Sequence, residues 1–151
     1  MPEIIIADTS SLIGLVKIDS LDLLREMYGR VVLTKEVADE YGEPLPDWFD
    51  VRLVTDRGML RSLLPALHLG EASAIALALE TDNATLVIDE KDGRNVARQL
   101  GIRITGTLGI LLKARNQNHI PELRPLVEKL RNKGFRISEQ LVQEILLQVG
   151  E

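Results

Sequence analysis

Acidic residues that follow predicted strands are the residues of this chain best suited to chemistry. Asp8 ends the apolar run 4–7 and precedes three hydroxyl residues, Thr9, Ser10 and Ser11. A short apolar run predicts a buried strand of a parallel sheet, and such sheets bind ligands outside the carboxyl ends of their strands. A carboxylate at that place can hold a hard metal ion or accept a proton. We expect Thr9 or Ser10 to cap the next helix.

Three further acids are expected near the same edge of the sheet. Asp89 ends a second apolar run at 84–88, Glu40 lies near the end of a helix that follows a strand, and Glu71 lies in the first turn of an Ala-rich helix. Each has an ordinary structural alternative. The helix dipole favours an acid at the position of Glu71, Glu40 suits a solvated helix face, and Asp89 suits a turn or an N-cap.

Alternating strand and helix patterns run through the whole chain. Short apolar runs predict strands at 4–7, 31–33, 51–54, 84–88 and 102–104. Helical spacing with caps predicts helices at 10–18, 20–28, 34–40, 59–67 (interrupted by Pro65), 70–80, 95–100, 106–115, 121–133 (with Pro at its first position) and 138–149. This alternation predicts an α/β fold, a three-layer α/β/α sandwich with a mainly parallel sheet of four to five strands. We expect one domain over 1–151, with the C-terminal helices 121–149 packed on it.

Composition narrows the classes of function. With 151 residues, 45% apolar and 27% charged, the chain has the composition of an ordinary globular domain. It contains no cysteine, which excludes disulfides and thiolate metal sites, and its two histidines, His68 and His119, are expected in loops or at helix ends. No apolar run reaches the length of a membrane span, so we expect a cytoplasmic protein. The net charge of −5 disfavours nucleic acid only weakly, because cations bound to clustered acids would offset it.

Other enzymes of this fold class need motifs that the chain lacks. A haloacid-dehalogenase phosphatase needs a second Asp two residues after the first, where Ser10 stands. No Gly-rich phosphate loop follows a strand, and no nucleophile elbow is present.

The ordered motifs resemble a known family. They are residues 6–13 (IADTSSLI), 34–40 (TKEVADE), 69–75 (LGEASAI) and 86–90 (LVIDE), followed by Gly93-Arg94, Gly106-Thr107-Leu108-Gly109 and Gly134 to Ser138. Together these segments look like the PIN domain, closest to a VapC-like subgroup, and cover nearly the whole chain.

The resemblance implies a Mg²⁺- or Mn²⁺-dependent ribonuclease, frequent homodimers and, in many members, a toxin paired with a small antitoxin. It implies that the acidic, metal-binding cluster consists of Asp8, Glu40, Glu71 and Asp89, with Thr9 or Ser10 beside it. Glu90 and Asp92 compete with Asp89 for the fourth position. Like charges brought together should raise at least one pKa.

Basic residues after Asp89 are the candidates for gripping RNA. Arg94 and Arg98 lie one helical turn apart and Lys91 precedes them, so together they suit a phosphate-binding face, although ordinary solvated side chains are the alternative. The first hypothesis for function is a metal-dependent endoribonuclease. The alternative is an inactive PIN-like module that binds RNA or protein. Dimerisation is expected through the apolar helix at 21–28 or the tail at 141–146, and the alternative is that both segments belong to the core.

Overall fold

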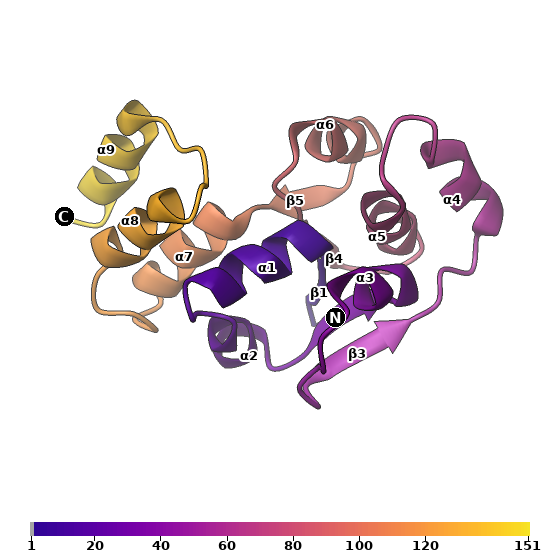
Figure 1. Cartoon of the computed structure of the whole chain (residues 1–151), viewed down its shortest axis with the longest axis horizontal. Coiled ribbons are helices and arrows are strands. Elements are labelled where there is room, and N and C mark those ends of the chain that lie inside the picture. Colours follow the sequence, from indigo (N-terminus) through magenta and orange to yellow (C-terminus); the bar gives the residue numbers. More distant parts are fainter. Residues whose placement is uncertain (1) are drawn as a thin grey trace.

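A parallel sheet of five strands forms the middle layer of the protein, in a computed structural model that describes residues 2–151 (Figure 1). The strands are β1 (Ile4–Ala7), β2 (Val31–Thr34), β3 (Phe49–Arg52), β4 (Ala84–Val87) and β5 (Arg103–Thr105), in the order β3-β2-β1-β4-β5. All four strand pairs are parallel. The prediction of a parallel α/β sheet is confirmed.

The strand order places a topological switch between β1 and β4. From β1 the chain builds outward to β2 and β3, and it then returns to the other side of β1 to form β4 and β5. In the register of this pair Ala7 lies opposite Val87, so the residues that follow each strand emerge next to each other. Open α/β sheets bind their ligands at such a switch.

Helices cover both faces of the sheet, because successive strand residues point to opposite sides. Ile5 and Ala7 belong to one buried apolar cluster, and Ile6 belongs to the other. The first cluster contains residues of α1 (Thr9–Lys17), α2 (Asp22–Tyr28), α3 (Lys35–Tyr41) and α7 (Thr107–Asn116), and it extends beyond the sheet into α8 (Arg124–Asn132) and α9 (Glu139–Gln148). The second cluster contains residues of α4 (Arg57–Leu63), α5 (Leu69–Leu79) and α6 (Lys91–Gln99).

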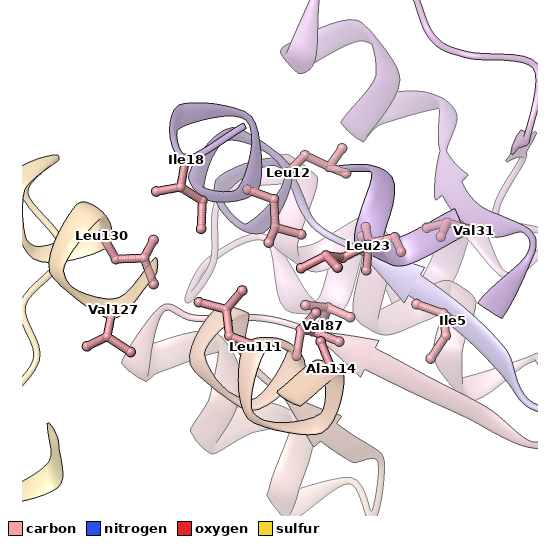
Figure 2. Packing of buried hydrophobic residues seen from close by; sticks show 14 of the residues in the cluster. Ile5, Leu12, Ile18, Leu23, Val31, Val87, Leu111, Ala114, Val127 and Leu130 are labelled. Atoms are coloured by element: carbon pink, nitrogen blue, oxygen red, sulfur yellow. The ribbon is translucent and has the colours of Figure 1, made fainter. Parts of the chain in front are cut away.

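The C-terminal helices share the first cluster. Val127 and Leu130 of α8 lie near Leu111 of α7 in Figure 2, and Leu146 of α9 is also buried. The apolar surfaces considered for dimerisation are therefore largely core, since Leu23, Leu24, Ile145 and Leu146 are all buried. On α9, Leu141 and Leu147 remain exposed.

Several element boundaries differ from the sequence prediction. β3 begins at Phe49, two residues before the predicted 51–54, and α4 ends at Leu63, so Pro65 follows the helix and does not interrupt it. α6 begins at Lys91 rather than Asn95. α8 begins at Arg124, and it is Pro125 that occupies its first turn, in place of Pro121. Proline lacks an N–H, which costs nothing in the first turn of a helix, so either proline satisfied the same rule.

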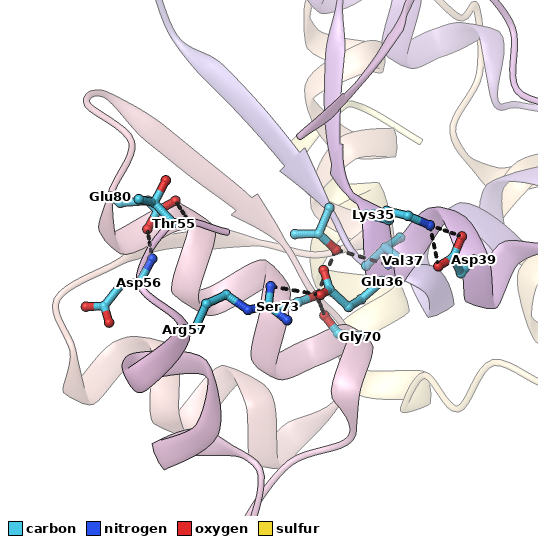
Figure 3. Close-up of polar contacts among 11 residues, drawn as sticks. Lys35, Glu36, Val37, Asp39, Thr55, Asp56, Arg57, Gly70, Ser73 and Glu80 are labelled. Atoms are coloured by element: carbon cyan, nitrogen blue, oxygen red, sulfur yellow. Dashed lines mark hydrogen bonds and ion pairs between the residues drawn. The ribbon is translucent and has the colours of Figure 1, made fainter. Parts of the chain in front are cut away.

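A buried hydroxyl pair fixes α3 against α5, the two helices that carry Glu40 and Glu71. Thr34 caps α3 by accepting a hydrogen bond from the Val37 N–H at 3.0 Å, as predicted. Its Oγ1 also lies 2.7 Å from Ser73 Oγ, and Ser73 in turn donates to the Gly70 carbonyl at 2.8 Å. Figure 3 shows Val37, Gly70 and Ser73 together at this contact.

Thr34→Ala should lower the free energy of unfolding by about 1–3 kcal/mol, because it removes a helix cap and leaves the buried Ser73 hydroxyl with one partner fewer. Ser138→Ala is the matched control, since Ser138 caps α9 at an exposed site through Leu141 alone. Denaturant unfolding of both variants measures the difference. Equal losses would show that the contact between Thr34 and Ser73 contributes nothing.

Candidate active site

Asp8 lies at the switch point, with one carboxylate oxygen in a hydrogen bond and the other without a partner among residues 2–151. It is itself the N-cap of α1, with Oδ1 accepting a hydrogen bond from the Ser11 N–H at 2.9 Å. The expectation that Thr9 or Ser10 provides this cap is wrong, because both already belong to the helix. The side chain is only 1% exposed, and Oδ2 has no hydrogen-bond partner within residues 2–151.

Asp89 lies next to Asp8 but is held by hydroxyl groups. Its Oδ2 accepts hydrogen bonds from Ser11 Oγ at 3.0 Å and from Thr107 Oγ1 at 2.6 Å, and its Oδ1 accepts one from the Thr107 N–H at 2.8 Å. It does not cap α6, because Glu90 occupies the N-cap position. Ser11 thus connects both acids, through its N–H to Asp8 and through its hydroxyl to Asp89.

Glu40 and Glu71 reach the same region from α3 and α5. Glu40 accepts a hydrogen bond from Thr9 Oγ1 at 2.9 Å, and its carboxylate fills the space that a Cβ on Gly70 would occupy. Glu71 is 9% exposed, and its Oε2 lacks a hydrogen-bond partner in the described part of the chain. Gly93 leaves room for it, since a Cβ there would lie 2.9 Å from Oε2.

One cavity of about 420 Å³ gathers these acids. Asp8, Glu40, Glu71 and Glu90 line it together with Thr9 and Ser10. Asp89 is absent from this lining and instead lines a larger neighbouring groove, while Asp92 lines a third cavity with Glu71 and Glu90. The acids proposed from the sequence therefore lie in adjoining cavities, and Glu90 lines all three.

Burial raises the pKa of Asp8 to about 7, with smaller upward contributions from the charges of Asp89 and Glu71, while the hydrogen bonds from Ser11 act in the opposite direction. Burial also raises the pKa of Glu71, and the charges of Glu90 and Asp92 add to the effect. The expected rise in pKa is found. For both Asp8 and Glu71 the main cause of the raised pKa is desolvation, whereas the sequence led us to expect repulsion between the acids.

The basic residues predicted to grip RNA occupy different environments. Arg94 donates a hydrogen bond from Nη1 to the Ile88 carbonyl at 2.7 Å and packs over Gly106, so its guanidinium supports the end of β4. Arg98 is exposed and lines neither the acidic cavity nor the larger groove. Lys91, at the start of α6, lines the larger groove beside Asp89.

A family model described as a PIN domain matches residues 4–151, almost the entire chain. The chain belongs to the PIN domain family. PIN domains are usually nucleases and generally use divalent metals. Comparisons with curated proteins and with solved structures gave no match. No helix within residues 2–151 is long and apolar enough to cross a membrane.

The carboxylates of this PIN domain are chemically suited to a divalent ion, but within residues 2–151 no group of three or more His, Cys, Asp or Glu side chains is placed to hold one. Mg²⁺ is usually bound by only one or two carboxylates, together with waters and substrate phosphates. Asp8 Oδ2 and Glu71 Oε2 are buried acceptors that find no hydrogen-bond partner among residues 2–151, and both residues line one cavity. Carboxylate oxygens such as these suit Mg²⁺ or Mn²⁺ as ligands.

Sequence reasoning missed three residues at this site. Ser11 and Thr107 hold Asp89, and His68 lines the acidic cavity from the N-cap position of α5, a helix end as predicted. Thr107 follows β5, so the rule that placed Asp8 and Asp89 at strand ends could have found it. Ser11 carried no such signal, because only the fold shows which of three successive hydroxyl residues faces β4.

Asp8→Asn should stabilise the protein at pH 8 in a chelating buffer, because Asn keeps the helix cap and removes a buried charge. The folded-state pKa of Asp8 lies near 7, above its ordinary value of 3.8, so the folded protein loses stability as pH rises from about 4 to 7. We expect the Tm of the variant to exceed that of the wild type by on the order of 5 °C at pH 8 and by little at pH 5.

Asp56→Asn is the control for this experiment. Asp56 caps α4 through Met59 in the same way but is exposed, so its substitution should give no gain that depends on pH. A gain for Asp8→Asn of the same size at pH 5 and pH 8 would contradict the assignment of a buried, ionised Asp8.

Proposed function

We propose that this protein is a Mg²⁺- or Mn²⁺-dependent endoribonuclease that hydrolyses RNA phosphodiester bonds at the cavity of Asp8 and Glu71. One observation carries the proposal. Two carboxylate oxygens without hydrogen-bond partners in the described residues, Asp8 Oδ2 and Glu71 Oε2, are buried on the wall of one cavity at the switch point of the sheet. Burying such groups is costly, and an active site is a common reason for retaining them.

The side chains of this site would have different roles, depending on how firmly hydrogen bonds hold each of them. Asp8 is fixed by its own helix cap, so its second oxygen is aimed rigidly, and together with Glu71 it would hold the ion. Glu40, exposed and steadied by Thr9, would orient the attacking water at the rim. Asp89 would act through Ser11 and Thr107, by fixing the starts of α1 and α7.

A divalent ion bound there supplies Lewis-acid chemistry, since it lowers the pKa of a bound water and offsets charge on the phosphate. The role of the protein is to fix the position at which the ion binds. With the pKa of Asp8 near 7, the apo site exchanges a proton close to neutral pH, so metal binding should release a proton and weaken as pH falls below 7.

The second candidate function is an inactive module that binds RNA or protein, and one observation favours it. All the observed hydrogen bonds of Asp89 are structural, so one of the four acids expected to bind metal serves the fold. The two functions differ in whether metal-dependent cleavage occurs.

Incubation of the purified protein with labelled RNA should give cleavage in Mg²⁺ or Mn²⁺ and none with a chelator. We expect Asp8→Asn and Glu71→Gln each to reduce the rate at least about 100-fold, because each removes a charged ligand of the ion. Glu43→Gln, an exposed acid outside the three cavities, is the matched control. Unchanged cleavage in Asp8→Asn would refute the site, and thermal stabilisation by Mn²⁺ without cleavage would favour the binding module.

Parallel assays of Asp89→Asn, Glu90→Gln and Asp92→Asn identify the remaining acid. The larger loss of Mn²⁺ stabilisation should come from Glu90→Gln, because Glu90 lines the cavity with Asp8 and Glu71, whereas Asp89→Asn should mainly lower stability without metal.

We further propose that the protein is the toxin of a toxin–antitoxin pair, on the basis of its likeness to VapC-like PIN domains. Expression of the wild type in bacteria should arrest growth, and expression of Asp8→Asn should not. A small protein encoded beside it should restore growth and copurify with it. Equal growth with both forms, at equal soluble expression, would contradict a toxin role. The homodimer stays a prediction, with exposed Leu141 and Leu147 on α9 as its remaining apolar surface.

A further inference from the structure

The largest cavity beside the acids is a groove of about 880 Å³ that reaches the C-terminal part of the chain. It adjoins the acidic cavity, because Ser10 and Glu90 line both. Its walls come from α1, from the start of α6 and from the connection between α8 and α9. In Figure 1 this connection and α6 both lie above α1, the connection on the left and α6 on the right.

Four cations line this groove, and none of them forms an ion pair within residues 2–151. They are Lys17 on α1, Lys91 on α6, and Lys133 and Arg136 on the connection, and all four are exposed. Elsewhere on this acidic protein some basic side chains are paired, as Lys35 is with Asp39 and Arg131 with Glu139. Cations collected in a groove without acidic partners are suited to bind an anionic chain.

Backbone packing holds the connection in this position. α8 is followed by Gly134 at φ +99°, and the Phe135 N–H donates to the Leu130 carbonyl at 3.0 Å. The Phe135 ring then packs on Gly14 of α1, where a Cβ would lie 2.8 Å from the ring. Because Phe135 lies between Lys133 and Arg136 in this anchored turn, the two cations are held beside α1.

We propose that this groove binds the backbone of a single-stranded RNA next to the cleavage site, with Lys17, Lys91, Lys133 and Arg136 contacting its phosphates. This inference rests on the proposed ribonuclease function. Ser10 and Glu90 line both the groove and the cavity of Asp8 and Glu71, so a strand that follows the cations leads to the edge of the proposed cleavage site. The ring of Phe135 is used in packing, so binding depends on phosphates and tolerates different sequences.

The shape of the site favours a single strand over a duplex. A-form duplexes are bound by surfaces that span many base pairs across the minor groove. Here the cations stand on three separate elements around one concave groove, which matches a single backbone that they can surround.

Binding of a labelled single-stranded RNA by the full chain, measured by fluorescence anisotropy in a chelating buffer at several salt concentrations, tests the proposal. Each phosphate contact on a single strand adds about 0.7 to the slope of log K against log salt. Lys133→Ala combined with Arg136→Ala should therefore bind several-fold more weakly and lower the slope by about 1.4. Lys17→Ala and Lys91→Ala, on other elements, should each lower it by about 0.7.

Lys129→Ala is the matched control, because Lys129 is an exposed lysine of α8 outside the groove. It should leave affinity and slope unchanged. In cleavage assays with Mn²⁺, the groove variants should raise KM and keep kcat, and they should keep the thermal stabilisation by Mn²⁺ that reports an intact acidic site.

Unchanged slopes in all groove variants would overturn the proposal, as would equal affinity for duplex RNA, or no RNA binding by the wild type. The proposed ribonuclease function fails separately, if cleavage is absent or survives Asp8→Asn.

Discussion

Parallel pairing of β1 with β4 is the constraint on which the rest of this structure depends. The pairing places Ala7 opposite Val87, and the Asp8 N–H donates to the Val87 carbonyl at 3.2 Å. Both strands are buried on both faces, so a shift in register by one residue would exchange the two apolar clusters. The positions of Asp8 and Asp89 follow from this pairing, and neither acid needs a flexible loop to reach the site.

Ser11 fixes the positions of the two acids that this register brings together. Its N–H and its hydroxyl bind the two acids that follow the paired strands, and the hydroxyl also lies 3.3 Å from the Val87 carbonyl. The start of α1 is thereby tied to both strands. One consequence is that Asp8 Oδ2 cannot turn away from the cavity unless Oδ1 gives up the hydrogen bond from the Ser11 N–H that caps α1. The burial that raises the pKa of Asp8 is thus built into the fold, and it disfavours the ionised carboxylate against the opposing effect of the Ser11 hydrogen bonds.

The sequence predicted the sheet, its parallel sense and the acids at its edge because these depend on local patterns. Apolar runs such as 84–88 have one stable environment, and the carboxyl ends of parallel strands must share an edge. What it could not predict depends on contacts between distant segments. Asp8 keeps one carboxylate oxygen without a hydrogen-bond partner among residues 2–151, whereas Asp89 is held by Thr107. This difference could be predicted only if the position of α7 were known. The hydrogen bond from Arg94 to the Ile88 carbonyl was missed for the same reason. Helical spacing predicts which residues share a helix face, but it does not predict which backbone carbonyl lies opposite that face.

The C-terminal helices illustrate how one segment can serve both stability and binding. Val127, Leu130 and Leu146 fill the same apolar cluster as the strands, so α8 and α9 cannot detach without exposing core residues. The same packing seats Phe135 on Gly14, a position where a larger residue would meet the ring. Since Asp8 caps α1 and Gly14 lies in the middle of this helix, one short helix connects the acids to the basic groove. A rigid helix with a carboxylate at its start and Lys17 at its end fixes the separation between the two sites, so the position of a bound backbone relative to the acids is set by helix geometry rather than by loop conformation.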